Sequence, residues 1–380
     1  MRFLTAGESH GPELTGIIDG LPAGLLIDPA AIAAALRRRQ AGYGRGGRQH
    51  IEHDEAEIVT GVTQGRTTGA PLTLRIVNRD YANQIAKPQP VLTVPRPGHA
   101  DLVGAIKYGL SDLRIVSERS SARETAMRVA VGALAQTLLA EFGVSIGSFV
   151  QAIGGVRATV PDLPWPEVFA LAEQSDVRCP DAAAAQAMRE RVDEARRRKD
   201  TIGGVIVVVA TGVPVGLGSY VQWDRRLDGH LAAAVMSIQA IKGVEIGDGF
   251  ALAERFGTEA QDAIAPSAAP PGWMRPTNHA GGLEGGMSNG QPIIVRAIMK
   301  PIPTTATPQN SIDLATGEAV PSQYLRSDTC AVPAAGVVAE AMVAWVLADA
   351  LVEKLGGDSI TEMKSRGRAA GVRVQGDTQR

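Results

Sequence analysis

Gly7-Glu8-Ser9-His10-Gly11 places a carboxylate, a hydroxyl and an imidazole between two glycines. The pattern matches G-x-S-x-G, which in serine hydrolases presents the nucleophile where a strand of an existing sheet turns into a helix. Only six residues precede this stretch, enough for one short strand over 2–6. The stretch therefore argues against a hydrolase fold and makes His10, rather than Ser9, the residue of interest. Taken alone, His10 fits a structural histidine in a turn better than a catalytic one.

Composition indicates a globular protein that binds a small ligand. The 380 residues are 44% hydrophobic and 21% charged, with a net charge of −2, so no bulk field attracts nucleic acid or membranes. The 43 glycines favour tight loops close to a ligand, and 4% aromatics argue against base-stacking surfaces. Cys179 and Cys330 have no metal or redox spacing, and no signal peptide is evident, so a cytoplasmic location is expected.

Hydrophobic periodicity predicts mixed helices and strands without a regular β-α-β alternation, which favours an α+β fold with antiparallel sheets. Asp28 and Pro29 mark the first helix start. Residues 257–276 are read as a long mobile loop, and the apolar segment 334–352 as a buried helix. We expect one domain over 1–364 and a disordered tail over 365–380. The expected helices are 30–39, 182–199, 227–241 and 334–355, and the expected strands 2–6, 57–62, 71–77, 144–153, 202–210 and 292–299.

A glycine-rich loop over 42–48 matches G-x-G-x-x-G. A dinucleotide fingerprint must follow a strand, and this loop follows a predicted helix, so we reject that interpretation. The loop carries Arg45 and Arg48 close to Arg39. Either a solvated basic turn or an anion clamp fits these arginines.

Two further stretches present chemically useful side chains. In Arg96-Pro97-Gly98-His99-Ala100-Asp101, the proline and glycine hold His99 in a rigid loop, although a surface histidine in a turn is also common. In 119–124, Ser121 and Glu124 fit a capping box, so a helix should start there and end at Gly143. Such a start, flanked by arginines, suits an anion.

These residues point to an enzyme acting on a small phosphorylated acid. Arginines in glycine-rich loops suit phosphate and carboxylate groups, and histidines suit proton transfer. No cluster of His, Cys, Asp or Glu has metal-ligand spacing, so no metal is expected.

The sequence resembles the chorismate synthase family along nearly its whole length. The resemblance rests on short motifs that occur in the family's order: 7–11, 37–45, 96–101, 119–125, 243–247, 278–282, 300–301 and 326–328. It implies a lyase of the shikimate pathway of aromatic amino acid biosynthesis. The reaction is the anti-1,4-elimination of phosphate from 5-enolpyruvylshikimate 3-phosphate to chorismate, with reduced FMN required and no net redox change.

The resemblance also implies architecture and partners. The fold would be a β-α-β sandwich, with helices between two four-stranded antiparallel sheets and long glycine-rich active-site loops. The protein would be a homotetramer, without nucleic-acid or membrane partners. NADPH is a candidate flavin reductant, although an external source of reduced flavin is favoured because no added reductase domain is visible. The loop from Gly257 would be a lid.

Site roles follow from the resemblance. His10 would protonate the departing phosphate, His99 would hold or protonate the flavin, and Asp328 would relay a proton near it. Arg39, Arg45 and Arg48 would contact the phosphate of substrate or NADP. The remaining residues would bind FMN: Arg119, Ser120, Ser121, Gln239, Ala240, Gly285, Lys300, Pro301, Ile302, Pro303, Thr304 and Arg326.

Two alternatives stay open at this level. A flavin-dependent oxidoreductase acting on a small phosphorylated acid would use the same flavin-binding residues. A nucleic-acid-binding module could use the arginines of the 42–48 loop, although low aromatic content and a net charge near zero count against it.

Overall fold

The computed structural model describes residues 1–46, 54–79, 81, 90–269, 271–323 and 328–376. Within these residues, a first antiparallel sheet has four strands in the order β1-β2-β6-β3. Its strands are β1 (Arg2–Ala6), β2 (Glu13–Asp19), β3 (Ala56–Thr60) and β6 (Leu72–Val77). Leu14, Ile18, Leu72, Leu74 and Ile76 are fully buried on one face, as alternation in half-buried strands requires.

The second antiparallel sheet has the order β10-β15-β9-β7-β8 in the described part of the chain. Its strands are β7 (Ser145–Ile153), β8 (Val156–Arg157), β9 (Gly204–Thr211), β10 (Ile241–Ile246) and β15 (Ile293–Met299). The central strand β9 is a β-branched run buried on both faces. The family resemblance predicted four strands; the two-residue β8 makes five.

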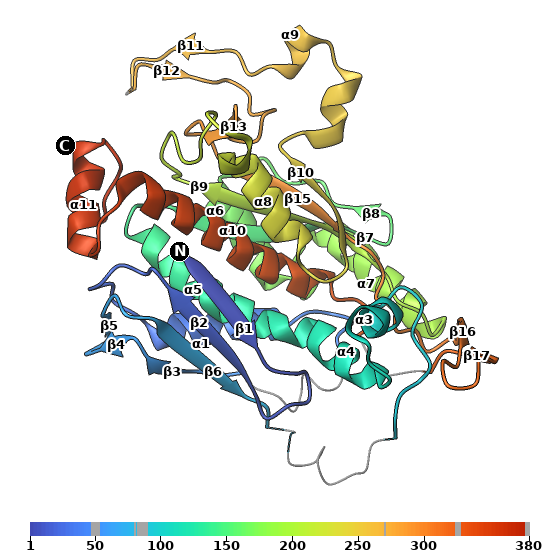
Figure 1. Ribbon diagram of the computed structural model, residues 1–380. Helices are drawn as coiled ribbons and strands as arrows, with labels where there is room; N and C mark the ends of the chain where they lie inside the picture. The colour runs from blue at the N-terminus through green and yellow to red at the C-terminus, as the bar shows by residue number, and fades with distance from the viewer. Residues whose placement is uncertain (47–53, 80, 82–89, 270, 324–327, 377–380) are drawn as a thin grey trace.

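Helices fill the space between the sheets, so the fold is α+β (Figure 1). On the first sheet lie α1 (Pro29–Gln40) and α5 (Thr125–Ala140), and on the second α8 (Leu227–Met236) and α10 (Val332–Leu355). The predicted start of α1 is confirmed, since the Asp28 side chain accepts the Ala30 N–H at 2.9 Å.

Helix α10 lies against α5, α8, β7 and β9 in the middle of the molecule. By length and composition it could cross a membrane, but 78% of its most apolar window is buried inside the protein, as a core helix would be. Its one buried charge, Glu340, pairs with Arg38 at 2.7 Å and Arg178 at 3.0 Å. The two arginines satisfy a carboxylate that would otherwise be costly to bury.

Smaller elements complete the described chain. They are β4 (Val62–Thr63), β5 (Arg66–Thr67), α3 (Asp101–Tyr108), α4 (Leu113–Ser120), η2 (Ala122–Glu124), α6 (Trp165–Gln174), α7 (Ala182–Arg197), η3 (Trp223–Arg225), η4 (Gly249–Glu254), α9 (Gly257–Ala260), β11 (Ala265–Pro266), β12 (Trp273–Met274), β13 (Leu283–Glu284), β14 (Met287–Ser288), β16 (Asn310–Ile312), β17 (Ala319–Pro321) and α11 (Ile360–Ala369).

Three further predictions about the course of the chain differ from the structure. The helix expected over 227–241 ends at Met236, because Ala240 takes a left-handed φ of 65° and Ile241 begins β10. The stretch 257–276 is not a featureless loop: it contains α9 and the β11–β12 hairpin, which projects from the body in Figure 1.

The C-terminal tail differs as well. Instead of becoming disordered at 365, the chain continues in α11 to Ala369, and Val372 and Val374 are 7% and 2% exposed in the main core. The last predicted tail residues, 377–380, lie outside the described part.

The close crossing of α5 and α10 generates the first prediction. A Cβ on Gly132 would lie 2.3 Å from the Ala341 Cβ, so Gly132→Ala forces the helices apart. We expect the free energy of unfolding to fall by about 1–3 kcal/mol in urea denaturation. Gly229→Ala is the matched control, because nothing lies within 4 Å of its added Cβ in α8. An equally stable Gly132→Ala protein would contradict this account of the crossing.

Candidate active site

The turn over 7–11 is held rigidly from behind. Gly7 has a φ of 104°, and a Cβ there would meet the Glu13 carbonyl oxygen at 2.3 Å, so glycine is required. The buried Asn78 amide donates to the Gly11 carbonyl at 2.7 Å. Its oxygen accepts from the Arg123 guanidinium at 2.8 Å. The turn thus has little freedom to move His10.

His10 is paired with a carboxylate that the sequence did not reveal. Its Nδ1 lies 2.7 Å from Oε1 of Glu118, and its backbone N–H donates to Oε2 at 2.6 Å. The imidazole remains 41% exposed. Because an ionised carboxylate can only accept hydrogen bonds, Nδ1 must donate to Glu118, and Nε2 is the other ring nitrogen.

Helix α4 connects this turn to the second histidine. Its consecutive residues Ser117, Glu118 and Arg119 contact three different segments. The Ser117 hydroxyl accepts from Arg96 at 2.6 Å, and Arg119 donates to the Gly7 and Thr5 carbonyls at 3.2 and 2.8 Å. One turn of helix therefore sets the position of both histidine loops.

His99 belongs to a buried ionic group. Its Nδ1 lies 2.6 Å from Asp101 Oδ1, and the Arg96 guanidinium donates two hydrogen bonds to Asp101 at 2.8 and 3.0 Å. Arg96 also lies 3.1 Å from the same Nδ1; since that nitrogen donates to Asp101, this contact is not a hydrogen bond. Burial opposes ionisation of Asp101, but the hydrogen bonds from His99 and Arg96 prevail and hold its pKa well below the ordinary value.

The segment after β15 closes on the His99 loop. Lys300 donates to the Gly98 carbonyl at 2.7 Å, and Arg96 donates to the Thr304 hydroxyl at 3.1 Å. Between them lie Pro301, Ile302 and Pro303, of which Ile302 accepts from Thr201 through its carbonyl. The structure thus brings the predicted 300–304 segment to His99.

The predicted anion-binding arginines occupy two environments. Arg45 forms an ion pair with Asp328 at 2.7 Å, and the Gly46 N–H donates to the same carboxylate at 2.6 Å. Asp328 and Thr304 line one cavity of about 130 Å³, together with Lys199 and Arg196. This cavity connects Asp328 with the segment that contacts His99.

Arg39 is buried instead, with 6% of its surface exposed. It donates to Thr125 at 3.0 Å and to the Ala122 carbonyl at 2.8 Å, and lies 3.8 Å from Asp54. Burial lowers the pKa of Arg39 to about 10. Through these two hydrogen bonds Arg39 stabilises the start of α5 and adds positive charge there.

The predicted capping box at Ser121 takes another form. The Ser121 hydroxyl accepts from the Arg123 N–H at 3.3 Å, and η2 precedes α5. The Glu124 carboxylate does not reach back to residue 121; it accepts from Thr5, Arg128 and Gln239.

Besides Arg45 Nε, two buried polar atoms of the predicted site residues lack a partner within the described part of the chain: Ser120 Oγ and Gln239 Oε1. Both belong to the residues predicted to bind the flavin. Ala240 lies next to Lys300, another predicted flavin ligand, because its carbonyl accepts the Lys300 N–H at 2.9 Å. Unsatisfied buried groups at this place fit a polar ligand.

Gly285 lies in the β13–β14 turn beside Tyr220, near the start of α8, whereas Gln239 follows the end of α8. Arg48 and Arg326 lie outside the described residues. Among the described residues, no group of His, Cys, Asp and Glu could hold a metal ion.

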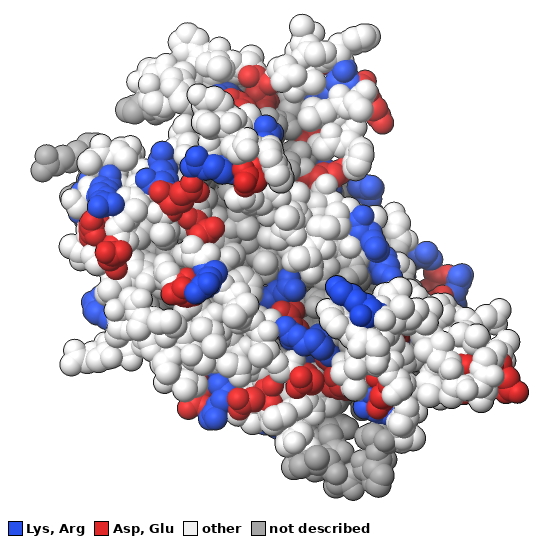
Figure 2. Space-filling model, viewed as in Figure 1, with Lys and Arg blue, Asp and Glu red and all other residues white. Residues whose placement is uncertain are grey.

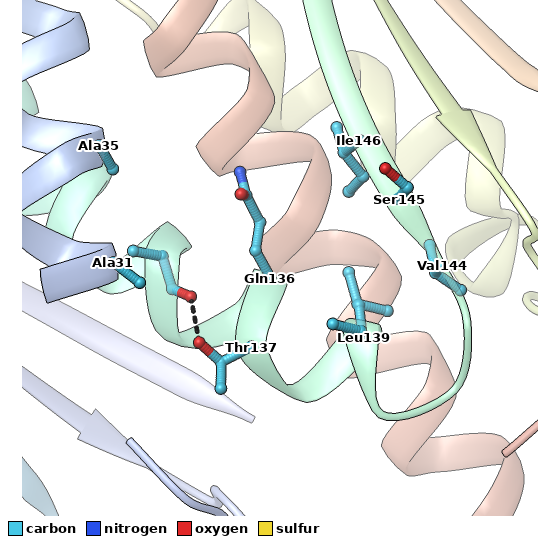
Figure 3. A pocket seen from close by; sticks show the side chains of 10 residues that line it. Ala31, Ala35, Gln136, Thr137, Leu139, Val144, Ser145 and Ile146 are labelled. Carbon is cyan, nitrogen blue, oxygen red and sulfur yellow. Dashed lines mark hydrogen bonds between the residues drawn. The ribbon is translucent and has the colours of Figure 1, made fainter. Parts of the chain in front are cut away.

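A second cavity, of about 290 Å³, lies elsewhere, between α1, α5 and the start of β7 (Figure 3). Its lining contains Ala31, Ala35, Gln136 and Ser145, and none of its lining residues is charged. We place the active site at the histidines, because that region holds the groups that can transfer protons.

Sequence reasoning missed Glu118, Asn78 and the whole of α4. A local signal was available for α4: Asp112 accepts the Arg114 N–H at 2.9 Å, which is an N-cap one turn before Ser117. Nothing local marks Asn78 as the support of a turn 67 residues earlier.

Two histidine–carboxylate pairs and several arginines surround one short helix of this α+β fold. This combination indicates an enzyme that acts on an anionic small molecule. The family model described as chorismate synthase matches residues 1–352. The chorismate synthase of Trichlorobacter lovleyi is 54% identical, covering 96% of this chain and 97% of its own. That of Geobacter sulfurreducens is 52% identical, covering 96% of each.

A solved structure agrees over the same length. "Crystal Structure of Chorismate Synthase" matches with a TM-score of 0.80 and 45% identity, covering 97% of this chain and 96% of that one. The chain belongs to the chorismate synthase family.

The depressed pKa of Asp101 generates the second prediction. A carboxyl whose folded pKa is lowered adds stability at pH above its ordinary pKa of about 4, and this stability is lost as the pH falls toward the folded value. Asp101→Asn should therefore unfold about 3–5 kcal/mol more easily at pH 7, with a smaller deficit at pH 3.

Urea denaturation at both pH values measures the effect. The exposed Asp162→Asn serves as the control and should change little. A deficit for Asp101→Asn that is equal at pH 7 and pH 3 would contradict the ion-pair explanation.

Proposed function

We propose that the protein is a carbon–oxygen lyase that eliminates phosphate from 5-enolpyruvylshikimate 3-phosphate to give chorismate, in the shikimate pathway. One observation carries the proposal: in a member of this family, α4 joins two histidine–carboxylate pairs, and the nearby arginines can hold an anion. Charge neutralisation and proton supply are the two needs of a departing phosphate.

His10 supplies the proton to the phosphate as the carbon–oxygen bond breaks. Its ring is the exposed member of its pair, and the fixed turn limits its movement. Arg45 binds the anion together with the neighbouring Arg48, while the buried Arg39 contributes charge from below. Asp328, paired with Arg45, exchanges a proton in the cavity shared with Thr304.

The residues present fit reduced FMN. Ser120 and Gln239 offer buried polar atoms without a partner in the described chain, and Lys300 to Thr304 frame the His99 loop. The remaining flavin ligands would be Arg119, Ser121, Ala240, Gly285 and Arg326. The chemistry supplied by bound reduced FMN is transient donation of electron density while phosphate leaves. With FMN bound, His99 would hold a proton on Nε2, because its Nδ1 is engaged by Asp101.

Further features of the family are part of the proposal. The protein would be a cytoplasmic homotetramer without nucleic-acid or membrane partners, with NADPH as a candidate reductant of the flavin. Residues 1–364 would act as one domain, with the family's β-α-β sandwich as its architecture. On the face shown in Figure 2, Lys and Arg lie beside Asp and Glu over most of the surface, and several Lys and Arg lie close together near the centre.

Phosphate release under anaerobic conditions tests the function. We expect the protein to release phosphate from 5-enolpyruvylshikimate 3-phosphate with pre-reduced FMN and not with oxidised FMN. The flavin absorbance should change only transiently. A permanent change of one flavin per product would instead identify an oxidoreductase, and release with NADPH and oxidised FMN would show that the protein reduces its own flavin.

The proton donor generates the next prediction. His10→Ala should lower kcat about 10²- to 10⁴-fold, because general acid catalysis contributes on that order, while FMN affinity stays near normal. His230→Ala is the control: this exposed histidine of α8 contacts the Asp224 carbonyl and should leave turnover unchanged. Normal turnover by His10→Ala would remove His10 from the mechanism.

A further inference from the structure

The Glu118 carboxylate contacts His10 at two atoms, one in the ring and one in the backbone. Its Oε1 lies 2.7 Å from His10 Nδ1, and its Oε2 accepts the His10 N–H at 2.6 Å. Its own carbonyl accepts the Ser9 N–H at 3.1 Å. The carboxylate is 19% exposed and the imidazole 41%, so Glu118 lies on the protein side of the ring.

The two contacts together dictate the protonation of the ring. The backbone N–H is a permanent donor, so Oε2 must accept, and an ionised carboxylate also accepts at Oε1. Nδ1 therefore carries a proton in every state of the ring. The other ring nitrogen, Nε2, is then the one that can gain or lose a proton.

We infer that Glu118 is a positioning residue for the elimination: it keeps His10 in the Nδ1-protonated form and directs Nε2 to the phosphate. The inference rests on the proposed role of His10. As the carbon–oxygen bond breaks, its electron pair leaves with phosphate, and the proton on Nε2 passes to a phosphate oxygen. Glu118 remains ionised, and the neutral ring retains its proton on Nδ1.

The geometry makes one substitution especially informative. In Glu118→Gln, the amide must direct its oxygen to the His10 N–H, because that position needs an acceptor. Its NH2 group then faces Nδ1, where it can only donate. The neutral ring would be driven to the opposite tautomer, with Nδ1 unprotonated and the proton on Nε2.

A merely structural role would give a different pattern. The turn has independent supports in Asn78 and Arg119, so loss of one charge on Glu118 need not unfold it. Glutamine also preserves the shape and the hydrogen bond to the backbone. If Glu118 had only a structural role, Glu118→Gln would lose less turnover than the shorter Glu118→Asp. If Glu118 sets the tautomer of His10, Glu118→Asp would lose less turnover than Glu118→Gln.

The test combines ring-nitrogen NMR with kinetics on the full-length protein. Solid-state 15N spectra of histidine-labelled protein give the tautomer of each of the six rings, and His10→Asn assigns the His10 signal. Above the titration of the ring, the wild type should show Nδ1–H, and Glu118→Gln should show Nε2–H. Glu118→Asp should retain Nδ1–H.

Turnover should follow the tautomer. We expect kcat to fall about 10²- to 10⁴-fold in Glu118→Gln, as it does when an orienting carboxylate of a catalytic histidine becomes an amide, with a nearly unchanged KM and FMN affinity. Glu118→Asp should lose less. Glu118→Gln combined with His10→Ala should be no slower than His10→Ala alone, because the two act as one unit.

The outcomes separate the inference from the proposed function. An Nδ1–H signal in Glu118→Gln, or a greater loss for aspartate than for glutamine, would overturn the role of Glu118 even if phosphate is released normally by the wild type. Absence of phosphate release by the wild type would instead overturn the function, while the ring spectra would still report whether Glu118 sets the tautomer.

Discussion

The crossing of α5 and α10 is the constraint on which the rest of the molecule depends. At Gly132 the added bulk of one methyl group has no room against Ala341, so these helices approach as closely as their backbones permit. Each helix also covers a sheet, α5 the first and α10 the second. A few small side chains therefore set the distance between the two sheets. The positions of the loops that leave the sheets depend on that distance.

The site uses this framework by way of α4, which lies between loops that come from distant parts of the sequence. Residues of α4 hold the 7–11 turn on one side and Arg96 on the other, and Arg96 in turn holds the segment after β15. Both histidines place Nδ1 within hydrogen-bond distance of a carboxylate, at 2.7 Å for His10 and 2.6 Å for His99. Repetition of this device suggests that proton placement, rather than nucleophilic attack, is what the site is built to control.

The sequence predicted best those features that depend on neighbouring residues. Asp28 and Pro29 located α1, and the β-branched run located β9, because caps and side-chain periodicity act locally. The sequence did not predict the end of α8, because the residue with left-handed φ that follows the helix is Ala240 and not a glycine. The ordered tail was missed because Val372 and Val374 are too few for a periodic pattern, yet they reach the core through tertiary contacts.

Site prediction followed the same division. The His10 and His99 turns were visible because glycine and proline mark rigid loops. The pairing of His10 with Glu118, 108 residues apart, could not be read from spacing, and neither could the burial of Arg39. The position of Gly285, beside Tyr220 in the β13–β14 turn, likewise could not be read from the sequence.

The buried Glu340 has a consequence for how the chain assembles. Its two partners, Arg38 and Arg178, are synthesised long before it, and α10 is the last of the helices between the sheets to leave the ribosome. Until α10 emerges, the inner face of the second sheet lacks the cover that α10 gives to β7 and β9, and the two arginines lack this carboxylate. Closure of the core is thus a late event that joins the two ends of the sequence, and such long-range contacts make folding slow.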